Sequence, residues 1–162
     1  MFYAILAVVL VLIDQLTKIL TRNFIELGES VTFIPGLLDL TYIKNTGAAW
    51  SILENHTWLL TALSAVIVLV IAWLMLKHFF TNWVGTLAAV LIMAGGVGNL
   101  IDRCVFKYVT DMIETTFMDF PVFNFADCCI TVGVVLLVIY VLFFCKDEKK
   151  EAKDGTDFPD GQ

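Results

Sequence analysis

The chain has 162 residues, of which 59% are hydrophobic and 16% charged, and its mean hydropathy is +0.86. So small a chain cannot hide this much apolar surface from water, which excludes a water-soluble domain, a disordered chain and a disulfide scaffold. Ten Lys and Arg against sixteen Asp and Glu exclude a nucleic-acid binder, because phosphate binding needs an excess of positive charge. An integral membrane protein remains.

Four stretches of the chain are long and apolar enough to span a membrane, which takes about 20 residues. We predict these spans over residues 2–20, 58–76, 83–101 and 125–145. They form one membrane domain over 1–145, and a charged tail follows over 146–162. The first stretch lacks a basic leader region and a small-residue cleavage site, so we interpret it as a retained anchor.

Four spans place both chain termini on the same side of the membrane. The lysines directly after Cys145 favour a cytoplasmic C-terminus, and the connections 22–56 and 102–124 then face outwards. Residues 31–44 are rich in β-branched and aromatic residues around a Pro-Gly turn, which predicts two short strands. Residues 104–123 are typical of a short strand or an interfacial helix. We therefore expect an α-helical integral membrane protein with four transmembrane helices and a small β-sheet module at the outer face.

Ionisable groups in or beside the spans need an explanation, because a charge inside a bilayer is costly. Asp14 lies four residues before Lys18, so the two side chains can pair on one helix face. A glycine-rich run near the end of the third span permits either close helix approach or a bent backbone. Asn99, Asp102 and Arg103 follow it within one helical turn. Asp102 and Arg103 could instead have a purely structural role, as an ion pair at the membrane interface.

The outer connections and the last span carry the other polar candidates. Asn45 and Gly47 belong to a turn of small residues beside the membrane, and Asp111 lies in the second outer connection. Asn124 is a good helix N-cap, and Asp127 stands where a capping-box acid would stand. A purely structural role would explain these last two residues locally.

The chain lacks the sequence motifs of several common classes of hydrolase. His56 and His78 are predicted on opposite sides of the membrane, and no His-Glu-x-x-His is present, so we expect no zinc site. A Gly-x-Ser-x-Gly elbow is absent, and the cysteines show no Cys-x-x-Cys spacing. Any chemistry is therefore expected from carboxylates and amides.

Five polar runs, taken in order, resemble the signature boxes of the lipoprotein signal peptidase (signal peptidase II) family. These runs are residues 14–18, 45–51, 98–103, 109–111 and 123–127. The resemblance covers the chain from about residue 14 to Gly133. It departs from the family pattern at two apolar positions, Trp50 and Met112, where the family more often has Phe.

The resemblance implies an aspartyl endopeptidase of the bacterial cytoplasmic (inner) membrane, with its active site at the outer face. Such an enzyme removes the signal peptide from a prolipoprotein by cleaving before a diacylglyceryl-modified cysteine. By box position, Asp111 and Asp127 are the catalytic pair. The residues that would support the site or bind substrate are Asp14, Lys18, Asn45, Gly47, Asn99, Asp102, Arg103 and Asn124. The implied partners are diacylglyceryl-modified prolipoproteins and membrane lipids, and we expect a monomer that uses no metal or cofactor.

Elementary electrostatics agrees with an aspartyl mechanism, because two neighbouring carboxyl groups cannot both ionise easily. Asp127 lies at a predicted helix N-terminus, where the helix dipole favours negative charge, so we expect Asp111 to carry the proton. One alternative function is a small transporter or proton-conducting bundle, which predicts mid-helix acids and an internal repeat. Another is a different intramembrane aspartyl protease class. That class needs an Asp where this chain has Asn99, and more spans.

Overall fold

The computed structural model describes residues 1–47 and 56–144. The elements are α1 (Phe2–Phe24), β1 (Ser30–Ile34), β2 (Leu38–Asn45), α2 (Thr57–Leu76), α3 (Trp83–Phe106), β3 (Val109–Thr115) and α4 (Phe125–Ile139), which continues as a π-helical turn (Tyr140–Phe144). Four helices of the described chain are long and apolar enough to cross a membrane, which confirms the predicted architecture. The predicted tail, and residues 48–51 of the second polar run, lie outside the described residues.

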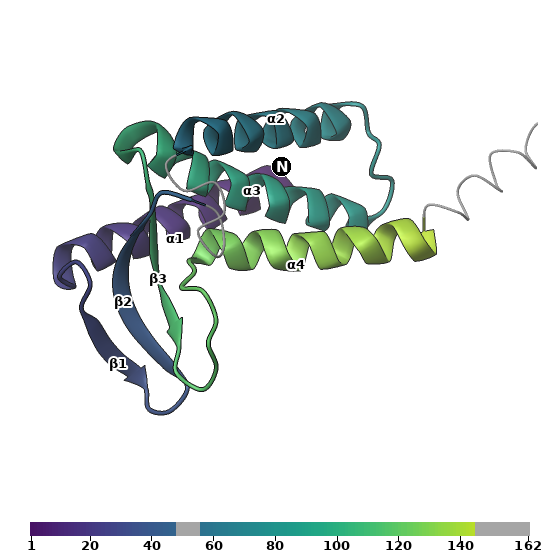
Figure 1. The fold of residues 1–162 in the computed structure, drawn as a ribbon. Coiled ribbons are helices and arrows are strands. Elements are labelled where there is room, and N and C mark those ends of the chain that lie inside the picture. Colours follow the sequence, from purple (N-terminus) through teal and green to yellow (C-terminus); the bar gives the residue numbers. More distant parts are fainter. Residues whose placement is uncertain (48–55, 145–162) are drawn as a thin grey trace, which may run out of the picture.

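Helix α3 is the centre of the bundle, with α2 and α4 on either side of it and α1 crossing behind (Figure 1). Just over half (56%) of its most apolar stretch is buried inside the protein, against 11–17% for the other three helices. The predicted close approach at the glycine-rich run is confirmed. A Cβ atom on Gly95 would overlap the carbonyl oxygen of Ala126 in α4, and one on Gly96 would lie 2.8 Å from Val68 Cγ2 in α2.

Two helices extend beyond their predicted ends. Helix α1 continues past Leu20 to Phe24, and α3 continues past Ile101 to Phe106. Hydropathy ends a span where polar residues become frequent, because it treats every residue as exposed to lipid. Here the added turns bury their charges against other parts of the protein, and Asp102 is fully buried.

The end of the bundle away from the sheet is held by apolar contacts. Tyr140 at the end of α4 packs against Phe80 and closely approaches Gly85 of α3. Its hydroxyl donates a 3.3 Å hydrogen bond to the carbonyl oxygen of Phe79, in the turn between α2 and α3. Asn82 caps the N-terminus of α3 there by accepting from the Gly85 N–H.

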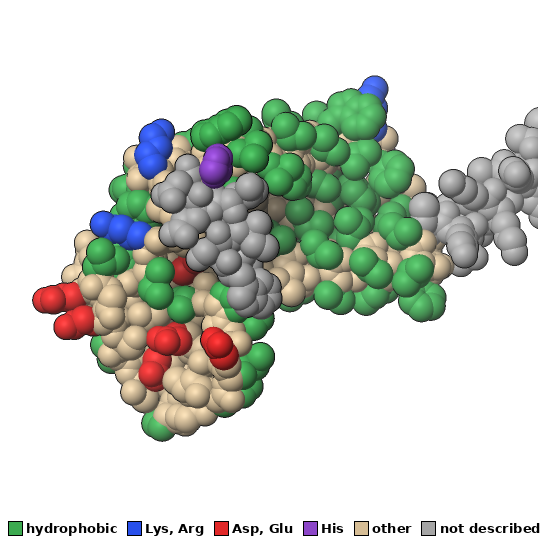
Figure 2. All heavy atoms as spheres, in the orientation of Figure 1, with side chains coloured by type: hydrophobic (Ala, Val, Ile, Leu, Met, Phe, Trp, Pro, Cys, Tyr) green, Lys and Arg blue, Asp and Glu red, His purple; other side chains and the backbone are tan. Residues whose placement is uncertain are grey.

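The three strands form an antiparallel sheet in the order β1-β2-β3, at the other end of the helices (Figure 1). The two strands predicted around Pro35-Gly36 are confirmed, and the second outer connection forms a strand rather than a helix. Gly36 in this turn has a φ of 74°, a backbone conformation that glycine adopts easily because it has no Cβ. Figure 2 shows hydrophobic side chains over the helices, and Asp and Glu gathered on the sheet.

A β-bulge in β2 sets the register next to the polar end of the bundle. Leu40 pairs with Ile113, but Ile43 pairs with Asp111, so β2 has one residue more than β3 between these pairs. Bulges of this kind re-aim the side chains beside them. In this register Asn45 lies opposite Val109, two residues from Asp111, which brings the amide of Asn45 within reach of the carboxyl group.

Candidate active site

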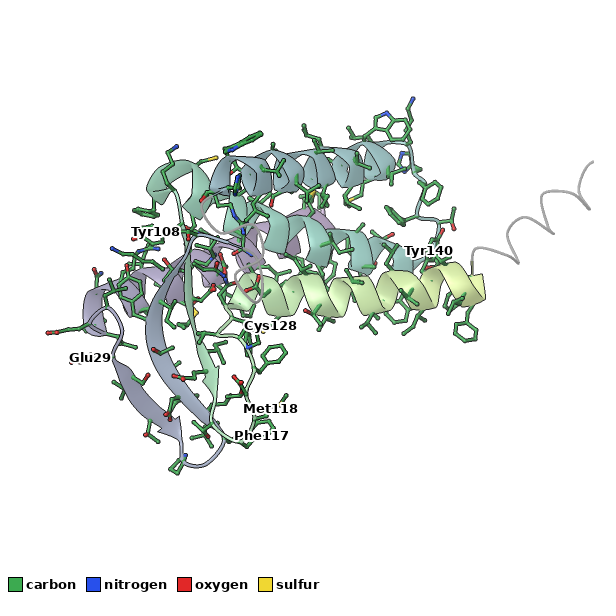
Figure 3. All side chains as sticks on the ribbon, viewed as in Figure 1. Glu29, Tyr108, Phe117, Met118, Cys128 and Tyr140 are labelled. Carbon is green, nitrogen blue, oxygen red and sulfur yellow. The ribbon has the colours of Figure 1, made fainter. Side chains whose placement is uncertain are left out.

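Asp111 and Asp127 line one cavity of about 650 Å³ where the sheet meets the helix bundle. Asp111 lies in β3 and Asp127 in the first turn of α4, next to Cys128, which Figure 3 shows at the start of α4 near β3. The cavity is also lined by Asn45 and Asn99. Residues far apart in the chain therefore converge on one site.

Asp111 is almost fully buried, with 2% of its surface exposed, and each of its carboxyl oxygens accepts one amide hydrogen bond. Asn45 Nδ2 donates to Oδ2 at 2.7 Å, and Asn124 Nδ2 donates to Oδ1 at 2.6 Å. The carboxyl group is thereby fixed in orientation by two different segments.

Asp127 is held in the same way. Asn99 Nδ2 donates to its Oδ1 at 2.8 Å, and the backbone N–H of Asn124 donates to its Oδ2 at 3.2 Å. Together with the bond from Asp127 N–H to Asn124 Oδ1, this forms the capping box predicted for α4. Asn124 therefore contacts both carboxyl groups, so the capping residue of α4 also ties the pair together.

The amide orientation of these three asparagines follows from their second partners, because each carbonyl oxygen accepts a hydrogen bond of its own. The donors are Gly47 N–H to Asn45 (2.9 Å), Lys18 Nζ to Asn99 (2.9 Å) and Asp127 N–H to Asn124 (3.0 Å). Each amide nitrogen must then point to a carboxyl group. The site is thus a pair of acids surrounded by donors in fixed directions.

The pKa of Asp111 is raised to about 7. Burial is the largest cause, and repulsion from the charge of Asp127 adds to it. The hydrogen bonds from Asn45 and Asn124 and the charge of Lys18 act in the opposite direction. Near neutral pH, Asp111 is therefore able both to hold and to release a proton, as a general acid–base group must.

Asp14 and Lys18 lie behind the cavity and support it. Their predicted pairing is confirmed, with 2.9 Å between Lys18 Nζ and Asp14 Oδ2, and both side chains are fully buried. Asp14 Oδ1 also accepts from the backbone N–H of Ala126, one of the amides that a helix N-terminus leaves unpaired. This pair thus connects α1 to the start of α4 and, through Asn99, to Asp127.

Asp102 and Arg103 have separate surroundings. Asp102 accepts from the backbone N–H of Thr110 at 2.9 Å and lies 3.6 Å from Arg22 Nη1 and 3.9 Å from Lys18 Nζ. Arg103 lines the cavity instead, and its Nε is buried with no hydrogen-bond partner in the described part of the chain. The local alternative of an Asp102–Arg103 pair is therefore wrong, because Asp102 turns to the cations of α1.

Three polar residues of this end of the bundle received no role from the sequence. Arg22 and Thr110 are hydrogen-bonded to each other, and Gln15 donates to both the Asp14 carboxylate and the Gly98 carbonyl. Arg22 could have been found, since it continues the four-residue spacing of Asp14 and Lys18 by one more turn. Thr110 lies in the run 109–111, but the sequence assigns it no role of its own.

The rest of the cavity wall is mostly apolar. Its side chains come from α2, α4 and the segment before α4, and include Ser64, Phe120, Val122, Phe123, Ile130 and Val132. Among the described residues there is no group of three His, Cys, Asp or Glu that could hold a metal ion. The arrangement is suited to bind an apolar segment with its polar backbone beside two acids.

Comparison with known proteins identifies the chain's relatives. Residues 6–143 match the family model described as signal peptidase (SPase) II. A lipoprotein signal peptidase of Enterococcus faecalis is 41% identical over 157 residues, which cover 96% of each chain. One of Lactiplantibacillus plantarum is 44% identical over 140 residues, covering 86% of this chain and 93% of the relative.

The fold has solved counterparts. A bacterial membrane enzyme determined by the in meso method at 2.3 Å resolution superposes with a TM-score of 0.82 at 31% identity, covering 99% of this chain and 93% of the other. A second such structure, at 1.9 Å resolution, gives 0.80 at 34% identity, covering 88% and 94%. Sequence and fold agree, and the chain belongs to the signal peptidase II family.

Proposed function

We propose that this chain removes signal peptides from prolipoproteins as an aspartyl endopeptidase, with Asp111 and Asp127 as the catalytic pair. Its cut lies before a diacylglyceryl-modified cysteine. The observation that carries the proposal is the shared cavity, in which the buried carboxyl group of Asp111 and the partly buried one of Asp127 are oriented by amide donors from three asparagines. Family membership supports the substrate class, and the carboxyl pair supports the reaction type.

The mechanism follows from one proton shared by two acids. Asp127 is the ionised member and takes a proton from the attacking water, while protonated Asp111 donates to the oxygen of the scissile carbonyl. The tetrahedral diol then collapses as a proton passes to the leaving amine. Because the two groups titrate together, this assignment names the dominant arrangement of one shared proton.

The charges around the pair support a singly protonated state. Three cations lie near the site, from α1 and α3: Lys18, Arg22 and Arg103. Two carboxylates, Asp14 and Asp102, offset two of these charges, and one ionised member of the pair offsets the third. Removing the last proton would leave an excess negative charge in a largely buried site, which is unfavourable at low dielectric.

The cavity walls support an apolar substrate. The scissile peptide would lie beside the acids, with its flanking residues and the lipid-bearing cysteine against Phe120, Phe123 and the side chains of α4. The helices cross the bacterial membrane, and we place both termini in the cytoplasm and the sheet at the outer face. In that placement the apolar end of the substrate stays in contact with lipid.

The test is cleavage by the purified protein of a prolipoprotein with and without its diacylglyceryl group. We expect cleavage of the modified form only, unaffected by chelators and abolished by Asp111→Asn and by Asp127→Asn. Each change keeps the size of the side chain and removes its charge. Activity that survives Asp111→Asn, or that a chelator abolishes, would overturn the aspartyl mechanism. Cleavage of both forms would overturn the substrate assignment.

A further inference from the structure

Arg22, in the last turn of α1, contacts three separate elements. Its Nη1 donates to Thr110 Oγ1 at 2.7 Å in β3 and lies 3.6 Å from the Asp102 carboxylate in α3. Its guanidinium also lies 4.5 Å from the centre of the Phe106 ring, at the end of α3. The side chain is only 14% exposed, so these contacts are largely shielded from water.

Thr110 is held on both of its polar groups by helix residues. Its hydroxyl accepts from Arg22, its backbone N–H donates to Asp102 at 2.9 Å, and the residue is fully buried. Successive side chains of a strand point to opposite faces. Thr110 therefore faces α1 and α3, while Asp111, the next residue, faces the cavity.

Thr110 lies in the buried half of β3, which its contacts tie to the helices. Residues Val109 to Met112 are buried, whereas the strand becomes half-exposed from Ile113 to Thr115. Asp111 thus lies one residue from a point where the strand is tied to two helices. A shift of the strand at this point would move the Asp111 carboxyl group relative to Asp127.

We propose that Arg22 is a positioning residue for Asp111 and acts through Thr110. Arg22 touches neither the cavity nor the catalytic carboxyl groups, so it leaves substrate binding unchanged and sets the distance between the two acids. The inference rests on the proposed function, because it concerns the geometry of the same carboxyl pair. Misplacement by about 1 Å can lower a rate by about 100-fold.

Loss of this contact also has a consequence for titration. The charged groups that face Asp111 are Asp127 from α4, Lys18 from α1 and Arg103 from α3, with the amide of Asn45 on β2. If Asp111 moves away from Asp127, repulsion between the two acids falls. The alkaline limb of the rate profile then moves to lower pH.

The experiment compares Arg22→Met and Thr110→Val with the wild type, on the diacylglyceryl-modified prolipoprotein. We expect kcat to fall about 10- to 100-fold with KM unchanged in both variants. In Thr110→Val, which keeps every charge near the pair, the alkaline limb should also shift towards acid. Arg22→Lys keeps the charge and should recover part of kcat. Matched controls are Lys107→Met, an exposed cation at the end of α3, and Thr115→Val, at the far end of β3; both should keep wild-type kcat.

Arg22→Met also leaves the buried Asp102 with one cation fewer, and that change can impair folding. Thr110→Val leaves the Arg22–Asp102 pair intact, so it tests the positioning role in a protein whose ions remain paired. In the double variant the loss of kcat should be smaller than the product of the single losses, because both changes break one connection.

Three outcomes would overturn the inference: wild-type kcat in Thr110→Val, an unmoved pH limb in Thr110→Val, or losses that multiply in the double variant. Failure of the proposed function is a different result, namely no cleavage by the wild type or full activity in Asp111→Asn. The two failures are therefore distinguishable in one set of assays.

Discussion

The two ends of the helix bundle are held together by different forces. At the end away from the sheet, aromatic and small residues such as Tyr140, Phe80 and Ala89 pack without a buried ion pair among the described residues. At the sheet end, buried Asp14, Lys18 and their neighbours are connected by hydrogen bonds and ion pairs. One end tolerates small displacements, whereas the other loses its bonds if atoms move.

The difference reflects what each end has to do. Helix association in a membrane depends on van der Waals packing, which is non-directional and spread over many atoms. Orienting two acids needs donors at fixed distances and angles, and a buried polar atom that loses its partner there is costly. The polar end therefore specifies geometry, and the apolar end contributes stability.

The sharpest test of this contrast uses two asparagines that cap helices at opposite ends, Asn124 of α4 and Asn82 of α3. Asn124→Ala removes the donor that orients Asp111 and the cap of α4, and we expect kcat/KM to fall by about 100-fold, since a misplacement by about 1 Å can cost that much in rate. Asn82→Ala should lower the free energy of unfolding by about 1 kcal/mol, the usual value of an N-cap, with activity unchanged. Cleavage kinetics and thermal melts of both variants measure this.

Equal losses of activity in the two variants would mean that the loss of a helix cap, and not the loss of the donor to Asp111, lowers the rate. Asn124→Asp adds a further control, because Asp keeps a capping oxygen but places a third carboxyl group beside the pair. It should therefore retain more stability than activity.

The pH dependence of cleavage tests the shared proton at the polar end. Because the pKa of Asp111 is raised to about 7, kcat/KM should fall about tenfold per unit as pH rises above about 7, where the pair loses its proton. Stability has its own window. Between the ordinary Asp value of about 4 and about 7, native Asp111 keeps a proton that the unfolded chain has released, so its contribution to the free energy of unfolding falls as pH rises.

Melting curves from pH 4 to 7 on the wild type and Asp111→Asn test the prediction on stability. The stability of the variant should depend less on pH. Values of kcat/KM measured over pH 6–9 test the prediction on the rate, and melting curves at each pH show whether the protein stays folded. A rate that stays level up to pH 9 would contradict the assigned proton.

Hydropathy was enough to predict the four helices, and the polar runs contain residues that the fold brings together around one cavity. They failed where contacts cross between elements distant in the chain. Helix α3 continues past the predicted span end near Ile101, and Asp102 there finds its partners on α1 and β3. Thr110 could not be identified as a support of Asp111, since its role depends on where β3 meets Arg22.

Local chemistry also gave a correct but incomplete account of α4. Asn124 and Asp127 do form a capping box, as their spacing predicts, and Asp127 also lines the cavity. A local pattern identifies the cap, and the fold adds the second partner, Asp111. Sequence spacing cannot indicate that contact, because Asp111 reaches Asn124 only after the chain returns beside β3.

The smallest predicted effect concerns Tyr140, at the apolar end. Tyr140→Phe removes the single hydroxyl bond to the Phe79 carbonyl and should lower the free energy of unfolding by about 1 kcal/mol or less, with wild-type cleavage. Tyr140→Ala also removes the ring, which is 1% exposed and packed on Phe80, and should lower it by about 3 kcal/mol. Unfolding in detergent measures both variants. If Tyr140→Phe lowered the free energy of unfolding as much as Tyr140→Ala, the apolar end would also depend on one directional bond. The two ends of the bundle would then no longer be held by different kinds of interaction.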